Sequence, residues 1–277
     1  MTGRKKVRIG FLAFQISMIA LSILVMFPLL YLVMASFKNK AEVNRPLAFP
    51  SSLFLDNYHQ AFANAHFFNL LGNSIIVVSF TIAILIVICS IAAYPLSRGR
   101  GRFYKIAYLF LLTGLMVPFQ AGMIPLYILL GKLGLVNNLF GLVFIDVGVN
   151  ISMAILIYSG FMKTIPREIE ESALIDGCGR FRMIALIIFP LLLPASVSVI
   201  LITIIPVWND FLSPLIFISS ELKKTLPVGI YNFMSARTVS MGPIFAFSVL
   251  TSLFPVLLFL FCQKYLYRGI IAGAVKG

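Results

Sequence analysis

The sequence predicts an all-α integral membrane protein with six transmembrane helices, and three observations support this prediction. Of the 277 residues, 60% are apolar and only 11% are charged, and the mean hydropathy is +1.02. A soluble domain carries about a quarter of its residues as charges, so this chain lacks the polar surface that would cover a water-soluble particle. The apolar residues gather in runs of about 20 or more, the length that crosses the hydrocarbon core as a helix. The basic residues lie in short clusters between these runs.

The apolar runs place the six helices in order along the chain. No charged residue occurs between Arg8 and Lys38, and this run is too long for the apolar part of a signal peptide, so we expect an uncleaved first helix. The other five helices are expected at about 69–95, 106–128, 140–161, 184–206 and 244–264. The expected organisation is an N-terminus, first helix and outer loop over 1–68, a five-helix unit over 69–265, and a C-terminal tail over 266–277.

The distribution of basic residues predicts the orientation in the membrane. Six crossings place both termini and the loops 97–105 and 162–183 on one side, which then carries 15 of the 22 lysines and arginines. The positive-inside rule therefore predicts a multi-pass plasma membrane protein with both termini in the cytoplasm. Topology accounts for the net charge of +13, and nucleic-acid binding is not expected. The three cysteines have no metal-binding spacing, so we expect neither a metal site nor a disulfide framework.

Prolines are frequent within the expected helices. Each removes a backbone donor and bends its helix, which membrane proteins tolerate where neighbours or water satisfy the freed carbonyl. Bent helices that line an opening path and ordinary membrane packing both remain open as explanations. Six of these prolines are Pro28, Pro118, Pro125, Pro190, Pro194 and Pro255.

The segment 164–182 differs from the other cytoplasmic connections in its length and its acidity. Pro166 suits the first turn of a helix, and four of the nine acidic residues of the chain lie between Glu168 and Asp176. Gly177 then favours a left-handed turn that ends the helix. An acidic face does not suit the anionic inner leaflet. A docking element for a protein partner is therefore favoured over a helix that lies on the membrane.

This segment resembles the EAA loop of the permease subunits of binding-protein-dependent ABC importers. The resemblance rests on Glu171, Ser172, Ala173, Asp176 and Gly177, followed by Pro190 and Pro194, which would bend the next helix. Ser172 and Cys178 stand where the family commonly has alanine, and both are small. Other stretches are similar to the carbohydrate branch, the family of the second maltose-transporter permease subunit, from about residue 45 to the C-terminus. They are Asn57 with Tyr58, Asn73 with Ser74, 93–98, 125–127, Trp208 with Asn209 and Asp210, 225–229 and 273–277.

The resemblance implies a type I ABC importer transmembrane fold, in which two permease subunits form the path for a sugar or oligosaccharide. The implied partners are a second, homologous permease in a heterodimer, two cytoplasmic ATPase subunits and an extracytoplasmic solute-binding protein, besides the sugar and the membrane lipid. Glu171 and Gly177 would matter for contact with the ATPase, flanked by Ala173 and Asp176. A bacterial or archaeal plasma membrane is implied.

The sequence contains no G-x-x-x-x-G-K-[ST] phosphate-binding loop. The chain is therefore expected to be a transport subunit without catalytic residues and without a cofactor of its own. ATP and magnesium would be used by the partner ATPase.

Several polar and aromatic residues outside this segment have alternative interpretations. Trp208, Asn209 and Asp210 end the fifth expected helix, either as an interfacial anchor with a polar cap or as an outer gate or binding-protein contact. The loop 219–241 is either solvated or an arm that reaches the binding protein. Asp146 lies early in the fourth expected helix, where a hydrated or interfacial position is favoured over a functional intramembrane acid. Sugar contacts could come from aromatic and amide side chains, and the candidates are Gln120, Tyr127 and Asn150.

Two other classes of function compete with the importer. An ion-coupled secondary carrier needs intramembrane charges for its ions and often has internal repeats, whereas Asp146 is nearly alone in the expected helices. A membrane enzyme needs a convergent catalytic set, and two histidines, His59 and His66, beside an outer loop provide little for one.

Overall fold

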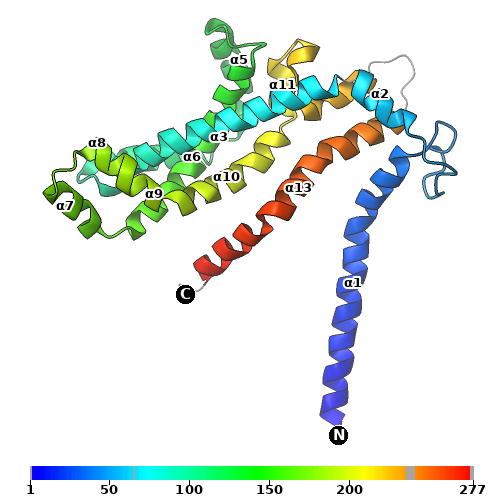
Figure 1. The fold of residues 1–277 in the computed structure, drawn as a ribbon, viewed down its shortest axis with the longest axis horizontal. Coiled ribbons are helices and arrows are strands. Elements are labelled where there is room, and N and C mark those ends of the chain that lie inside the picture. The colour runs from blue at the N-terminus through cyan, green and yellow to red at the C-terminus, as the bar shows by residue number, and fades with distance from the viewer. Residues whose placement is uncertain (1, 65, 235–240, 275–277) are drawn as a thin grey trace. The chain divides into compact units, whose positions relative to one another are not determined.

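The computed structural model describes residues 2–64, 66–234 and 241–274, and every regular element in these ranges is a helix (Figure 1). Residues 235–240 of the loop 219–241 and residues 275–277 of the C-terminal stretch lie outside the described residues. The chain divides into two compact units. Unit 1 comprises Met1–Phe67 with Gly229–Phe254, and unit 2 comprises Phe68–Val228 with Pro255–Gly277.

Unit 1 contains the first transmembrane helix. Helix α1 (Thr2–Ser36) includes an apolar stretch of 23 residues, Phe14–Ser36, whose most hydrophobic window has no buried residue. An apolar helix with an exposed surface on all sides suits lipid or a partner helix. The short helices α2 (Asp56–Asn64) and α12 (Tyr231–Met234) and the first part of α13 (Met241–Ala274) complete this unit.

The segment 37–55 folds back onto the end of α1 around one buried lysine. Lys38 is 1% exposed, and its Nζ donates to the carbonyls of Arg45 and Pro46 at 2.8 Å each. The amide of Asn57 donates to the carbonyls of Ser36 and Lys38, also at 2.8 Å. A buried ammonium group needs such acceptors, since its desolvation is costly without them. Lys38 therefore organises the segment rather than contributing surface charge.

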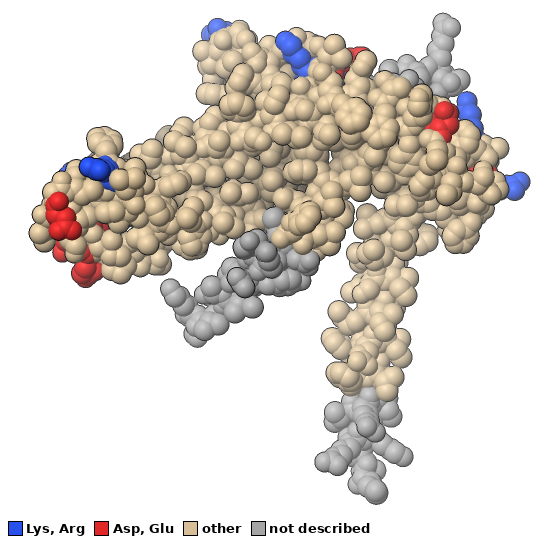
Figure 2. Space-filling model, in the orientation of Figure 1, with Lys and Arg blue, Asp and Glu red and all other residues tan. Residues whose placement is uncertain are grey.

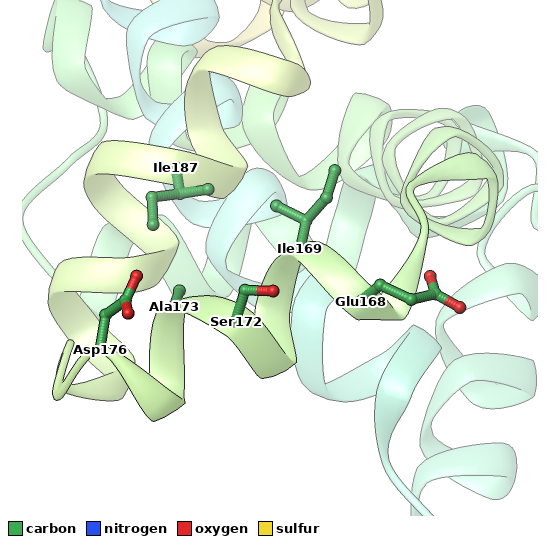
Figure 3. A pocket seen from close by; sticks show the side chains of 6 residues that line it. All are labelled: Glu168, Ile169, Ser172, Ala173, Asp176 and Ile187. Atoms are coloured by element: carbon green, nitrogen blue, oxygen red, sulfur yellow. The ribbon is translucent and has the colours of Figure 1, made fainter.

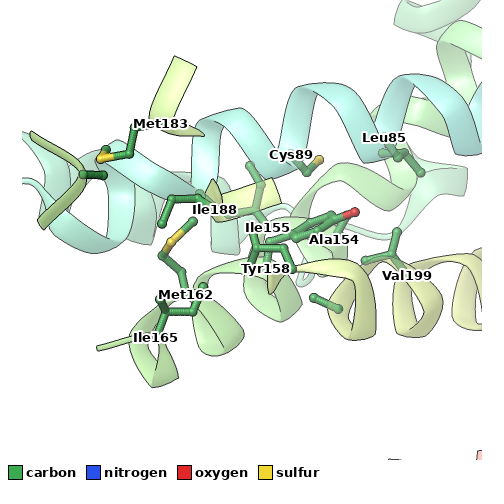
Figure 4. Close-up of a cluster of buried hydrophobic side chains, with 14 residues drawn as sticks. Leu85, Cys89, Ala154, Ile155, Tyr158, Met162, Ile165, Met183, Ile188 and Val199 are labelled. Carbon is green, nitrogen blue, oxygen red and sulfur yellow. The ribbon is translucent and has the colours of Figure 1, made fainter. Parts of the chain in front are cut away.

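Unit 2 is built on three long helices with a shared core. They are α3 (Phe67–Arg98), α6 (Leu139–Thr164) and α10 (Leu193–Trp208). Small residues let α6 and α10 pack closely, namely Ala154 on α6 and Ala195 and Ser196 on α10. Tyr158 is fully buried there, and its hydroxyl lies 2.8 Å from the Ser196 hydroxyl. Figure 4 shows this core cluster, which also includes Ala173, Met183 and Ile188 from the segment between α6 and α10.

The single helix predicted over 106–128 is broken. The structure has α4 (Arg102–Thr113), the 3-10 turn η1 (Phe119–Gly122) and α5 (Met123–Lys132) in its place. Pro118 has extended backbone angles, with φ −67° and ψ 127°. Proline lacks the backbone donor and disfavours helical geometry at the residue before it, which favours a break at this point. Hydropathy alone does not reveal such a break.

The helix predicted over 184–206 is also divided. The chain forms α8 (Arg180–Met183), a π-helical turn η2 (Ile184–Ile188) and α9 (Phe189–Leu191), and then bends by 67° into α10. Pro190 and Pro194 flank the bend, and each removes one helical hydrogen bond. The amide of Phe189 bonds instead to the carbonyl of Ile184, five residues back.

Among the described residues, four helices are long and apolar enough to cross a membrane, or five if the bent pair is one span. They are Phe14–Ser36, Phe67–Arg98, Leu139–Thr164 and Met241–Phe261, with Arg180–Leu191 and Leu193–Trp208 as the bent pair. The predicted class, an all-helical membrane protein, is confirmed. The predicted count of six is not, because the third span is divided into α4, η1 and α5.

Replacing Ala195 with leucine should destabilise unit 2. Ala195 is fully buried against α6, so three extra carbon atoms would overpack this contact at a cost of about 1–3 kcal/mol. Val197 lies on the same helix with 39% of its surface exposed, and Val197→Leu is the matched control with an expected change within about 0.5 kcal/mol. The fluorescence of Trp208, the only tryptophan, reports thermal unfolding in detergent. Equal midpoints for the two variants would contradict this packing.

Candidate functional site

The acidic segment forms a separate short helix, α7 (Arg167–Ile175), between α6 and α8. Pro166 occupies the N-cap position with an extended backbone. Glu168 and Glu170 lie in the first turn of the helix, where the helix dipole favours negative charge. Gly177 ends the helix with φ +79°, a left-handed conformation that glycine adopts without steric cost. The amide of Cys178 then bonds to the carbonyl of Ala173 at 2.9 Å, which closes the turn.

Helix α7 has one buried face and one exposed face. Glu170 and Ala173, three residues apart, are 7% and 6% exposed, and Ala173 joins the core of unit 2. Glu171, Ser172 and Asp176 are exposed. The residues of the EAA-like pattern therefore do not act alike: Ala173 attaches the helix to the core, and the others face outward or form the turn.

Glu170 attaches α7 to the end of α3. Its Oε1 accepts from Nε of Arg98 at 2.7 Å, and its Oε2 accepts from the hydroxyl of Tyr94 at 3.1 Å. Nη2 of Arg98 also donates to the carbonyl of Ile165 at 2.6 Å, at the end of α6. Charge-assisted bonds of this kind are roughly twice as strong as neutral ones. We call Tyr94, Arg98 and Glu170, with the Ile165 carbonyl, the α7 clamp.

The role of Glu170 was not apparent from the sequence, in which Glu170 is one of several acids that suit the start of a helix. Glu170 and Ala173 are three residues apart, so they lie on the same face of a helix. This spacing is the signal in the sequence that could have identified Glu170. The partner residues Tyr94 and Arg98 belong to the stretch 93–98, which was noted only for its resemblance to the carbohydrate branch.

A groove of about 430 Å³ lies along α7, between this helix and Ile187 of η2 (Figure 3). Two large apolar side chains at and after the end of α7 face outward, since Ile175 is 84% exposed and Phe181 is 89% exposed. On the face shown in Figure 2, acidic side chains gather at the end of unit 2 that α7 occupies. Exposed apolar groups rimmed by charge mark a protein-binding surface. The groove is lined by Glu168, Ile169, Ser172, Ala173, Asp176 and Ile187.

The loop 218–226 is fixed to α3 by side-chain to backbone bonds. The side-chain amide of Asn73 donates to the carbonyls of Leu222 and Lys224 at 2.8 Å each. The backbone N–H of Leu226 donates to the Ser74 hydroxyl at 2.8 Å. This part of the loop is therefore held in place rather than freely solvated. Two of the carbohydrate-branch stretches, Asn73 with Ser74 and 225–229, meet here.

Asn137 holds the same loop from the start of α6. The backbone N–H of Asn137 donates to the carbonyl of Phe217 at 2.8 Å, and its side-chain Oδ1 accepts from the backbone N–H of Ser220 at 3.0 Å. Nζ of Lys223 donates to the Asn137 carbonyl at 3.1 Å. Asn137 has φ 58°, a left-handed conformation that asparagine tolerates better than most residues.

Trp208, Asn209 and Asp210 have different environments. Trp208 is 1% exposed, so the interpretation of this residue as an interfacial anchor is wrong. Oδ1 of Asp210 accepts from the amides of Leu212 and Ser213 at 3.1 and 3.2 Å, and so caps the short helix α11 (Leu212–Phe217). Asn209 is exposed between them.

The three candidate sugar-contact residues lie on three elements, and no hydrogen bond or ring contact joins any two of them within the described ranges. Gln120 is exposed in η1, and Tyr127 is 45% exposed on α5 with its ring 5.7 Å from that of Phe217. Asn150 donates to the carbonyl of Asp146 within α6. Asp146 is only 7% exposed, which differs from the hydrated position that the sequence favoured.

Residues 85–272 match the family described as "Binding-protein-dependent transport system inner membrane component". The chain is 37% identical over 260 residues to the "Probable starch degradation products transport system permease protein" of Thermoanaerobacterium thermosulfurigenes, covering 93% of this chain and 94% of that one. It is 32% identical to the "Melibiose/raffinose/stachyose import permease protein" of Bacillus subtilis, covering 90% and 91%.

The fold also matches a solved structure. A chain of a bacterial ABC transporter involved in the import of the acidic polysaccharide alginate superposes with a TM-score of 0.82 at 21% identity, over 93% of this chain and 96% of that chain. At this identity the likeness concerns the fold alone.

Replacing Asn73 with alanine should release the loop 218–226. Two hydrogen bonds would be lost at about 1 kcal/mol each, which raises the fraction of molecules with a detached loop by roughly thirtyfold. Tryptic cleavage after Lys223 and Lys224 should accelerate accordingly. Ser248→Ala on α13, which removes one hydroxyl bond within that helix, is the control and should leave cleavage at these lysines unchanged. Equal cleavage rates for Asn73→Ala and the unmodified protein would contradict the attachment of the loop.

Proposed function

The chain belongs to the family of binding-protein-dependent transport system inner membrane components, and from this premise we propose that it forms half of the path by which a sugar or oligosaccharide is imported. Its family makes it a permease subunit of an ABC importer, a transport subunit that does not itself catalyse a reaction. The observation that carries the proposal is α7, an acidic helix with an exposed groove that is attached to the transmembrane core by the α7 clamp.

Helix α7 is proposed as the coupling element for a cytoplasmic ATPase. Glu171, Ser172 and Asp176 are exposed, Gly177 ends the helix, and Ile175 and Phe181 add exposed apolar surface at and after its end. The sequence lacks a phosphate-binding loop, so ATP and magnesium would be bound by two partner ATPase subunits. This placement puts α7 and both termini in the cytoplasm, as the distribution of basic residues predicts.

A second, homologous permease is proposed to complete the path. Helix α4 has a largely apolar sequence but no buried residue within this chain, which suits a surface that a neighbouring subunit covers. With η1 and α5 it forms the proposed third crossing, which brings the number of crossings to six. Pro118 would then open the backbone within the membrane, which is tolerated where a cavity or another protein surrounds it.

The substrate class is inferred from the relatives, whose names describe starch degradation products and melibiose, raffinose and stachyose. Tyr127 and Gln120 are exposed side chains of the kinds that sugars bind, by stacking and by paired hydrogen bonds. The loop 218–226 and the exposed Asn209, which precedes α11, are proposed as the contact for an extracytoplasmic binding protein. A bacterial or archaeal plasma membrane is the proposed location.

An ion-coupled secondary carrier is the alternative, and burial of Asp146 within α6 is the observation that favours it. A carrier would not need the exposed acidic surface of α7. Membership of the importer family also argues against it.

Replacing Glu171 with lysine should remove the ATPase without affecting folding. Glu171 is exposed, so its substitution leaves the core intact, whereas loss of a charge-assisted contact should weaken ATPase binding on the order of tenfold to a hundredfold. The measurement is the amount of ATPase that copurifies from detergent-solubilised membranes. Glu221→Lys is the matched control, an exposed glutamate in the loop 218–226, and it should retain the ATPase. Full retention of the ATPase by Glu171→Lys would contradict the assignment of α7.

The proposed third crossing is tested by thiol labelling of intact cells. Arg100→Cys and Lys132→Cys place single thiols at either end of α4, η1 and α5 in a chain whose three native cysteines are replaced. A membrane-impermeant maleimide should label Lys132→Cys from outside and Arg100→Cys only after permeabilisation. Labelling of both from the same side would mean that this region does not cross the membrane.

A further inference from the structure

We propose that Tyr94 and Arg98 are positioning residues that fasten α7 to α3, so that α3 transmits displacement of α7 to the loop 218–226. This inference rests on the proposed function of α7 as the coupling element. It assigns the transmitting part of the molecule to one helix and to the contacts at its two ends.

At one end of α3, the α7 clamp is nearly excluded from water. The side chains of Arg98 and Glu170 are 12% and 9% exposed, and the Tyr94 hydroxyl takes up the second carboxylate oxygen of Glu170. Removing one partner of a buried ion pair leaves an uncompensated charge, so the pair strongly resists separation. Any movement of α7 away from α3 would have to break this contact.

Arg98 also controls the connection between α7 and α6. Its Nη2 donates to the carbonyl of Ile165, which follows the last residue of α6 and adopts extended geometry with ψ 124°. The same guanidinium therefore fixes the α6–α7 turn and the first turn of α7. On its other side, α7 continues into α8 through Gly177 and Gly179, where the chain leaves helical geometry. The clamp is thus the polar attachment of α7 to a long helix.

At the other end of α3, Asn73 and Ser74 hold the loop 218–226 through three backbone groups. From Asn73 to Arg98 the helix is continuous, and 25 residues at 1.5 Å each give a length of about 37 Å. Figure 1 shows α3 running from the neighbourhood of α7 and α8 to that of α11. A helix with both ends fastened transmits a displacement that flexible loops would absorb.

The inference predicts that α7 and the nearby end of α3 move as one body. Spin labels at Arg100→Cys and Arg167→Cys, in a chain without the native cysteines, report the distance between the end of α3 and the start of α7. The complex with its ATPase is measured without nucleotide and after trapping with ATP and vanadate. The distance distribution should be the same in both states, and Arg98→Gln should make it shift or broaden on trapping. A nucleotide-dependent shift in the unmodified clamp, or no difference with Arg98→Gln, would overturn the inference.

A second measurement keeps the test valid if Arg98→Gln does not fold. Tyr94→Phe removes a single hydroxyl. Arg98→Lys retains the positive charge but lacks the guanidinium that bonds to Glu170 and to the Ile165 carbonyl at the same time. In proteoliposomes, the stimulation of ATPase activity by the binding protein requires a signal between the two ends of α3. The ratio of stimulated to unstimulated activity should fall at least threefold in Tyr94→Phe, and Arg98→Lys should retain more stimulation than Arg98→Gln.

An unchanged ratio in Tyr94→Phe with normal expression would overturn the inference, as would equal ratios in Arg98→Lys and Arg98→Gln. If no ATPase binds even the unmodified chain, it is the proposed function that fails. The two failures are therefore distinguishable.

Discussion

The buried ion pair between Arg98 and Glu170 holds the polar helix α7 against the apolar core of unit 2. Helix α7 has an acidic, exposed side, and an isolated polar helix of nine residues has little stability of its own. Ala173 contributes one small side chain to the core, which is not enough to fix the orientation of the helix. The ion pair fixes it, and the exposed groove and the free acidic side chains take their positions from this contact.

Prolines and asparagines fix the bends and the loop of unit 2. Pro190 and Pro194 bend the chain by 67° beyond α8, so that α10 can return along α6 through its small residues. Asn73 and Asn137 hold the loop 218–226 by its backbone, in addition to the buried side chains of Ile218 and Leu226. Polar contacts are therefore used where segments end or turn, and apolar packing is used along the lengths of the helices.

Much of the fold could be predicted from hydropathy because lipid requires long apolar helices. The runs at 69–95 and 140–161 became α3 and α6 with extensions at both ends. Breaks within apolar runs were harder to foresee, since the backbone is extended at Pro118 whereas Pro28 lies inside a helix. Proline bends or ends a helix according to its neighbours, which one sequence does not display.

The candidate site was predicted in part. The acidic helix and its glycine turn followed from local signals between Pro166 and Gly177. The contacts of Glu170 and Asn73 could not be predicted, because their partners lie 72 and about 150 residues away in sequence. The burial of Trp208 and Asp146 was missed for the same reason: position near the end of a helix suggests water, whereas tertiary packing decides burial.

The most direct test of the account is photo-crosslinking from Cys178, a partly exposed native thiol beside the turn that ends α7. With the other two cysteines replaced, a maleimide-linked benzophenone on Cys178 samples the surroundings of α7 in native membranes. The account predicts a covalent adduct with a soluble ATPase subunit, identified by mass spectrometry. Adducts with lipid alone, from membranes in which an ATPase still copurifies with the chain, would contradict α7 as the coupling element.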